Sequence, residues 1–412
     1  MRRYLLVLAA LGALVVPAAA HADAVTQWNQ NASTAIFGVA QQPPQQSVLH
    51  MAMVHGAVYD AVNAIDGTHD GYLLNSRLAS PFDSKEAAAA AAAYKVLLNI
   101  VPAQQAVLDA QYALSLSTIP DSSSKRRGIA VGEAAAAAMI AARTDDGRFG
   151  PFRFLIGDVP GAWRPVLPLF VNDPNAWLKD VKPFLIGDPS DYRSKGPLDL
   201  TSRAYAREFE EVKSLGSASS STRTTQQTYA ARYWAENPPA TWSRIFRTVS
   251  AQEGVSLVDD ARLYAMLYMT AADSLISVWV DKAYWPFWRP ITAIREADTD
   301  GNPLTEKDAG WLPLISTPPY AEHSSGHSGL SGSIVATLQD FFGTDEIGWT
   351  DTNNGGFTRS FTRFSDAIDE IIEARVWSGI HFHTADEQGA RIGKEVERYA
   401  QQHYFGTVNP AP

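Results

Sequence analysis

The sequence has 412 residues, of which 46% are hydrophobic and 19% are charged, and it contains eleven tryptophans and no cysteine. This apolar content excludes a wholly disordered chain, because such chains lack the apolar surface that offsets ordering entropy. The lack of cysteine excludes disulfides and any zinc or iron–sulfur site with cysteine ligands. The net charge of −10 disfavours sequence-independent binding of nucleic acid, so we expect no nucleic-acid partner.

The first 22 residues predict a secretory signal peptide. Arg2 and Arg3 precede an apolar run over 4–20, and Ala20-His21-Ala22 has the small residues of a cleavage site. A membrane anchor is the weaker interpretation, because Pro17 interrupts a run that is shorter than the ~20 residues that a span needs. No later stretch is expected to span a bilayer, so the sequence predicts a soluble protein that is secreted or periplasmic.

Helical patterns dominate the rest of the chain. Asp83 and Glu86 have the spacing of a capping box before an alanine-rich run that Pro102 stops. Alanine content or a period near 3.6 residues predicts further helices over 123–143, 255–279, 364–378 and 385–402. No sustained alternation predicts a sheet. The fold class is therefore predicted to be all-α, and the alanine runs favour close packing between helices.

Two stretches are predicted to be loops. Residues 150–200 are rich in proline and aromatic residues, and residues 214–224 are rich in serine, threonine and glycine. Neither stretch is charged or repetitive enough to be a free linker. We expect an N-terminal helical part, 23–245, that packs on a C-terminal helical part, 246–412, and the two parts can share one core.

Three segments of the C-terminal part combine cations, histidines and a hydroxyl. They are Lys282-Ala-Tyr-Trp-Pro-Phe-Trp-Arg289-Pro290, Ser325-Gly326-His327 and Arg375-Val-Trp-Ser-Gly-Ile-His381. The arginines can offer planar forks to pairs of oxygens, and the lysine offers a compact point charge. The histidines offer one acid–base group and one nucleophile or ligand. Each residue alone is more often a surface charge or a core histidine, but the conjunction predicts a site for a tetrahedral oxyanion.

The pattern Lys-x6-Arg-Pro, Ser-Gly-His and Arg-x5-His resembles the signature of the type 2 phosphatidic acid phosphatase superfamily. Within it, the chain is most similar to the branch of secreted bacterial vanadium-dependent haloperoxidases. Residues 53–63, 161–165 and 221–224 are also similar to that branch. The resemblance implies a helical bundle of the vanadium haloperoxidase and acid phosphatase type, with the site among the helices.

The resemblance also implies vanadate as the cofactor and a role for each motif residue. His381 would bind the vanadium in a haloperoxidase, or attack phosphorus in a phosphatase, and His327 would be the acid–base group at the apical oxygen. The equatorial oxygens would be held by the other motif residues, which are Lys282, Arg289, Ser325, Gly326 and Arg375. One cradle would serve both chemistries, because vanadate resembles the trigonal-bipyramidal transition state of phosphoryl transfer.

Two features near the motifs bear on the activity. Chloroperoxidase-type members have aromatic residues three positions before the motif lysine and seven before the second-motif histidine. Trp279 and Tyr320 hold these positions here, which indicates an apolar halide pocket, with core packing as the alternative account. The family usually has an aspartate four residues after the third-motif histidine, but Ala385 holds that place here and Asp386 follows. Because five residues do not return to the same helix face, Asp386 is expected to orient His381 poorly.

The function implied by the resemblance is a vanadate-dependent haloperoxidase. It would oxidise halide with hydrogen peroxide to a hypohalous species that halogenates a small organic substrate. Two alternatives stay open: a secreted acid phosphatase that cleaves phosphate esters through a phospho-His381 intermediate, and a non-catalytic phosphate- or vanadate-binding protein. The two intact histidines disfavour the last alternative, because a passive binder needs neither an acid nor a nucleophile. The sequence leaves the halide, the organic substrate and the oligomeric state open.

Overall fold

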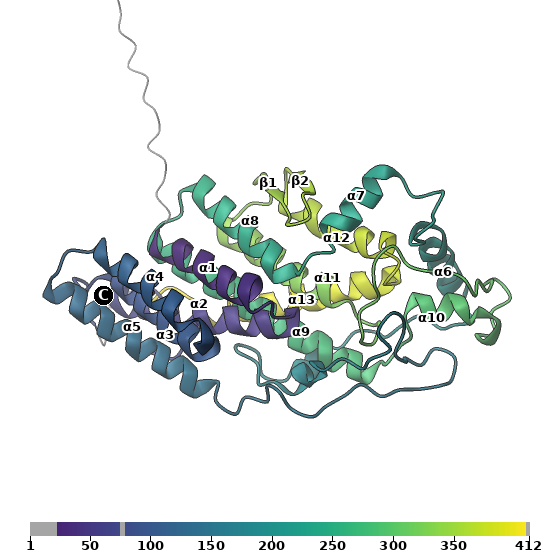
Figure 1. Ribbon diagram of the computed structural model, residues 1–412, viewed down its shortest axis with the longest axis horizontal. Coiled ribbons are helices and arrows are strands. Elements are labelled where there is room, and N and C mark those ends of the chain that lie inside the picture. Colours follow the sequence, from purple (N-terminus) through teal and green to yellow (C-terminus); the bar gives the residue numbers. More distant parts are fainter. Residues whose placement is uncertain (1–22, 75–78, 409–412) are drawn as a thin grey trace, which may run out of the picture.

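The computed structural model describes residues 23–74 and 79–408, so the predicted signal peptide lies outside it. The described chain is a bundle of α-helices with one small hairpin, which confirms the predicted all-α class (Figure 1). The helices are α1 (Ala24–Ser33), α2 (Pro44–Asp66), α3 (Lys85–Ile100), α4 (Gln105–Ser117), α5 (Ser123–Ala142), α6 (Arg203–Leu215), α7 (Thr225–Tyr233), α8 (Pro238–Glu253), α9 (Leu257–Tyr284), α10 (Pro290–Arg295), α11 (Gly326–Phe342), α12 (Phe364–Trp377) and α13 (His383–His403). The strands are β1 (Trp349–Thr352) and β2 (Thr358–Phe361). Short π- or 3-10-helical turns lie at Thr34–Val39, Pro102–Gln104, Ala176–Asp180, Pro189–Tyr192 and Ala297–Thr299.

Two local predictions need correction. Ser84 rather than Asp83 caps α3, because its side chain accepts the Ala87 N–H, while the Asp83 carboxylate binds Arg127. The hairpin of β1 and β2 has no counterpart in the sequence analysis. Its strands have four residues each and are too short to show a clear alternation.

Helix α9 is the central helix of the fold. It packs against α2, α11 and α13, and most of its residues are buried (Figure 1). By length and composition this helix could cross a membrane, contrary to the sequence expectation, but 94% of its most apolar window is buried inside the protein. A helix that is covered on all sides is apolar all round, so the long apolar stretch reflects a core position.

One buried core connects the N-terminal and C-terminal parts of the described chain. It extends from Val25 in α1 to Phe405 after α13, and α8 runs through the predicted boundary at 245/246. The alanine run of α3 is fully buried, and Gly132 of α5 packs closely on the Ala88 carbonyl. This contact agrees with the close helix packing expected from the alanine runs. The division into 23–245 and 246–412 stays a prediction.

Helices α11 and α13 touch through their backbones. A Cβ atom at Gly393 would lie 2.1 Å from the Gly329 carbonyl oxygen, and one at Gly389 would lie 2.4 Å from the Ser325 carbonyl oxygen. The Ser325 N–H also donates to the Ala385 carbonyl at 2.8 Å. These contacts bring the second motif segment, at the start of α11, against the start of α13.

Replacing Gly393 with alanine is therefore expected to destabilise the protein by about 1–3 kcal/mol, because the added methyl group overpacks the crossing. Urea unfolding measures the change. Gly38 is the matched control, since a Cβ at this exposed turn position meets nothing within 4 Å, and Gly38→Ala should cost nothing. A Gly393→Ala variant as stable as the wild type would contradict the close crossing.

Candidate active site

The three motif segments converge at helix ends. Lys282 lies in the last turn of α9, Arg289 directly precedes α10, and Arg375 lies in the last turn of α12. Ser325-Gly326-His327 opens α11, and His381 lies in the short connection between α12 and α13. Helices from distant parts of the sequence thus hold these side chains together.

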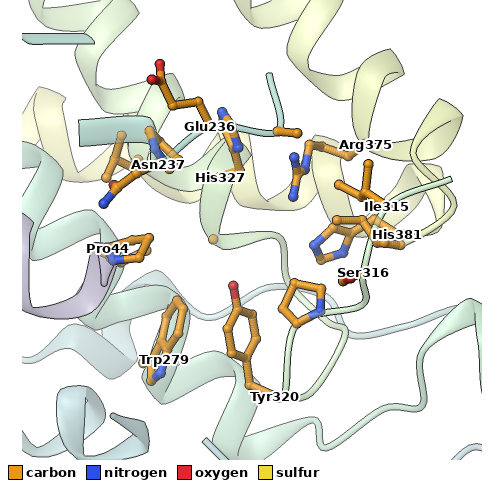
Figure 2. Close-up of a pocket in the computed structure, with 17 residues that line it drawn as sticks. Pro44, Glu236, Asn237, Trp279, Ile315, Ser316, Tyr320, His327, Arg375 and His381 are labelled. Atoms are coloured by element: carbon orange, nitrogen blue, oxygen red, sulfur yellow. The ribbon is translucent and has the colours of Figure 1, made fainter. Parts of the chain in front are cut away.

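A cavity of about 300 Å³ lies where these ends meet. Six of the ten predicted site residues line it: Trp279, Tyr320, Gly326, His327, Arg375 and His381. His327, Arg375 and His381 lie on one side, and Trp279 and Tyr320 lie on the other (Figure 2). The remaining wall is mostly apolar, and only Ile380 in it belongs to a motif segment. It consists of Pro44, Ala235, Glu236, Asn237, Pro238, Leu275, Ile315, Ser316, Pro318, Leu330 and Ile380.

The first-motif cations lie behind the cavity wall and are fully buried. Lys282 Nζ donates to the backbone carbonyls of Ala321 and Glu322 at 2.8 and 2.9 Å. Arg289 Nε donates to the backbone carbonyl of Tyr320 at 2.9 Å. Three consecutive carbonyl groups therefore fix both cations, and the ammonium group keeps a third N–H to offer.

Several buried nitrogen atoms at the site have no partner among the described residues. They include Arg289 Nη2, Arg375 Nε and His327 Nε2, and Trp279 Nε1 in the opposite wall is also without a partner. Buried polar atoms in folded proteins are nearly always hydrogen-bonded, so three such atoms around one site indicate a missing polar ligand. The donors carry positive charge or adjoin it, and this set fits a vanadate or phosphate oxyanion.

The start of α11 adds to the positive character of the site. Ser325 is the N-cap residue, and its hydroxyl accepts the Ser328 N–H. A Cβ atom at Gly326 would lie 2.8 Å from the Trp279 ring, so only glycine fits beside that ring without a shift. The free N–H groups of a helix start carry partial positive charge, which favours an anion.

Burial and repulsion between neighbouring cations lower the pKa values of the basic groups at the site. Burial, with Arg289 next in importance, lowers the pKa of Lys282 well below its usual value. Burial also lowers the pKa of His327 and of His381 well below the usual range, and nearby Arg375 and Arg289, respectively, add to this effect. Both imidazoles are therefore neutral at pH 7. A bound anion would relieve the repulsion between the cations.

No hydrogen bond joins Asp386 to His381. The Asp386 Oδ1 atom accepts the Ser328 hydroxyl at 2.8 Å. His381 precedes α13, so the relation between the two residues does not follow from the faces of one helix, as the sequence analysis assumed. The His381 ring instead places Nδ1 2.8 Å from Glu322 Oε1, and this oxygen also accepts the Phe382 N–H at 3.0 Å. The sequence analysis missed Glu322. The available signal was an acidic residue five positions before the second-motif histidine.

Trp279 and Tyr320 form one wall of the cavity. Their ring centroids lie 4.9 Å apart, and the Tyr320 hydroxyl points into the open space opposite His327 (Figure 2). Lys282 Nζ lies 5.2 Å from the Tyr320 ring centroid. The pair is thus both packed and in contact with the cavity, and its role in halide binding stays a prediction.

Comparisons with known proteins find similarity over the part of the chain that carries the motifs. Residues 262–410, which contain all three motifs, match the family model described as the VCPO second helical-bundle domain. A crystal structure of the first bacterial vanadium-dependent iodoperoxidase superposes with a TM-score of 0.80 at 20% identity, covering 94% of this chain and 97% of the other. The chain has the fold of the vanadium haloperoxidases.

Two further vanadium-dependent peroxidases are similar to this chain. A holo-type bacterial vanadium-dependent chloroperoxidase superposes with a TM-score of 0.71 at 17% identity, covering 92% of this chain and 97% of the other. The vanadium chloroperoxidase of Curvularia inaequalis is 25% identical over 248 residues, which are 49% of this chain. The match spans only 40% of that relative's length.

Proposed function

We propose that this protein is an exported vanadate-dependent haloperoxidase that oxidises a halide with hydrogen peroxide. The observation that carries the proposal is the group of unpartnered nitrogen atoms on Arg289, Arg375 and His327, beside a cavity that Trp279 and Tyr320 close on the far side. The similarity to a vanadium chloroperoxidase and to bacterial vanadium-dependent peroxidases supports it. The signal-peptide pattern of residues 1–22 supports export.

Each motif side chain has a distinct task in this proposal. Bound vanadate would supply the electrophilic centre that activates peroxide towards halide. The lone pair of His381 Nε2 would hold the anion, and the two arginines would bind its oxygens through their forks. Lys282 would withdraw electron density through its remaining N–H, and neutral His327 would accept a proton from peroxide. The apolar wall would exclude water from the halide side.

The direct test is halogenation by purified protein loaded with orthovanadate. We expect peroxide-dependent oxidation of iodide, or bromination of monochlorodimedone with bromide, and loss of both when vanadate is removed. Assays with iodide, bromide and chloride side by side define the halide range. A vanadate-loaded protein that oxidises none of the three would contradict the proposal.

The same preparation tests the two alternative functions. An acid phosphatase would release phosphate from p-nitrophenyl phosphate, and vanadate would inhibit it as a mimic of the transition state. A passive binder would take up vanadate or phosphate without turnover in either assay. Since the cradle fits both oxyanions, halogenation and phosphate release must be measured with and without orthovanadate.

A further inference from the structure

One short segment holds three motif residues from three different elements. In the Tyr320–Glu322 segment, the first carbonyl accepts a hydrogen bond from Arg289 Nε, and the next two accept hydrogen bonds from Lys282 Nζ. The Glu322 side chain accepts a hydrogen bond from the His381 ring. The Glu322 N–H donates to the Phe287 carbonyl at 3.0 Å, which ties the segment to the chain just before Arg289. The segment therefore fixes the relative positions of these residues.

The Glu322 carboxylate fixes the orientation of the third-motif ring. Oε1 accepts both the ring Nδ1–H of His381 and the backbone N–H of the next residue, Phe382. Both side chains are almost completely buried, with 1% of Glu322 and 3% of His381 exposed. Two bonds from one oxygen, one to the ring and one to the backbone beside it, define the rotation of the ring relative to the chain.

The contacts on the two ring nitrogens also define the tautomer. His381 Nε2 lies 3.1 Å from Arg289 Nη1, and a guanidinium group can only donate. Nε2 must therefore carry the lone pair, and Nδ1 must carry the hydrogen that Glu322 accepts. The unprotonated nitrogen faces the arginine, on the side where the proposed oxyanion would bind.

We propose that Glu322 is the positioning residue for His381, the part that the family resemblance would assign to an aspartate at the position of Ala385. Glu322 holds the imidazole as the Nδ1–H tautomer, so that Nε2 keeps the lone pair with which it would bind the oxyanion. Asp386 does not take this part in the structure: its Oδ1 accepts the Ser328 hydroxyl, and the His381 Nδ1 atom pairs with Glu322. The inference rests on the proposed function for the identity of the anion, whereas the ring geometry stands apart from it.

The test reads the imidazole nitrogens of His381 directly. Nitrogen-15 spectra of histidine-labelled wild-type protein should show one neutral His381 ring with hydrogen on Nδ1. Glu322→Ala should produce a second ring population and lower the affinity for vanadate, measured by equilibrium dialysis, by about 10–100-fold. Glu322→Gln should restore a single population and recover most of the affinity, because the amide oxygen can still accept both N–H groups.

Glu397 provides the matched control. It is also a buried glutamate, on α13 but away from the cavity, so Glu397→Gln should leave the His381 signals and the vanadate affinity unchanged. A wild-type ring with hydrogen on Nε2 would overturn the proposal, whether or not the alanine variant folds. A folded Glu322→Ala protein with one ring population and wild-type affinity would overturn it as well. If the wild type binds no vanadate, the proposed function fails, while the nitrogen spectra still test Glu322.

Discussion

Replacing His381 with alanine is expected to abolish vanadate binding and to lower vanadate-dependent halogenation by about 10³-fold. The variant removes the unprotonated Nε2 atom that Glu322 and Arg289 hold in place. Equilibrium dialysis with orthovanadate measures the binding, and the iodide and bromide assays measure the turnover. A His381→Ala protein that keeps either property near the wild-type level would show that His381 is not the vanadium ligand.

His327 gives the contrast that separates binding from acid–base chemistry. His327→Ala is expected to keep vanadate affinity within about tenfold while turnover falls by about 10²–10⁴-fold, because proton transfer rather than anion binding is lost. His403 is the matched control for both variants, since it is exposed near the end of α13 and remote from the cavity. His403→Ala should behave as the wild type in dialysis and in turnover.

Replacing Arg289 with lysine is expected to weaken vanadate binding by about 3 kcal/mol, a factor of about 10². The guanidinium group binds the Tyr320 carbonyl through Nε and the Ile380 carbonyl and His381 ring through Nη1, which leaves Nη2 for an oxyanion. A lysine keeps the charge but concentrates its donors on one nitrogen, so it cannot make all these bonds in the same geometry. Dialysis with orthovanadate measures the loss.

Arg295→Lys is the control for the arginine variant. Arg295 lies at the end of α10, the short helix that Arg289 directly precedes. It is half-buried and donates to the Trp311 carbonyl at 2.9 Å, but it does not line the cavity. Its replacement should leave vanadate affinity unchanged. This control distinguishes the loss of the Arg289 guanidinium group from a general disturbance of α10. If Arg289→Lys binds vanadate as tightly as the wild type, the fork geometry is not what holds the anion.

Helical patterns account for much of the fold. The helix expected over 123–143 is α5, and those expected over 364–378 and 385–402 are α12 and α13. These predictions succeed because apolar spacing along a helix depends only on residues that are near in sequence. The β1–β2 hairpin was not predictable in this way, because its strands have only four residues each.

The sequence also predicted one part of the candidate site and not another. The motifs specified which cations, hydroxyl and histidines to expect, since a side chain's charge and donors are properties of the residue itself. They did not specify that three carbonyls of the Tyr320–Glu322 segment would fix Lys282 and Arg289. Nor did they identify the cavity wall contributed by Pro44 and residues 235–238, which carry no recognisable pattern.

By itself the sequence determined the helical class and which cations, hydroxyl and histidines the three motifs contain. Only the tertiary structure decided which carboxylate serves His381. That carboxylate belongs to Glu322, 59 residues away in the chain, and the connections of α11 and α13 bring it there. The physical reason is that the partner depends on backbone contacts such as those at Gly389 and Gly393, and no spacing along the chain encodes where two helices cross.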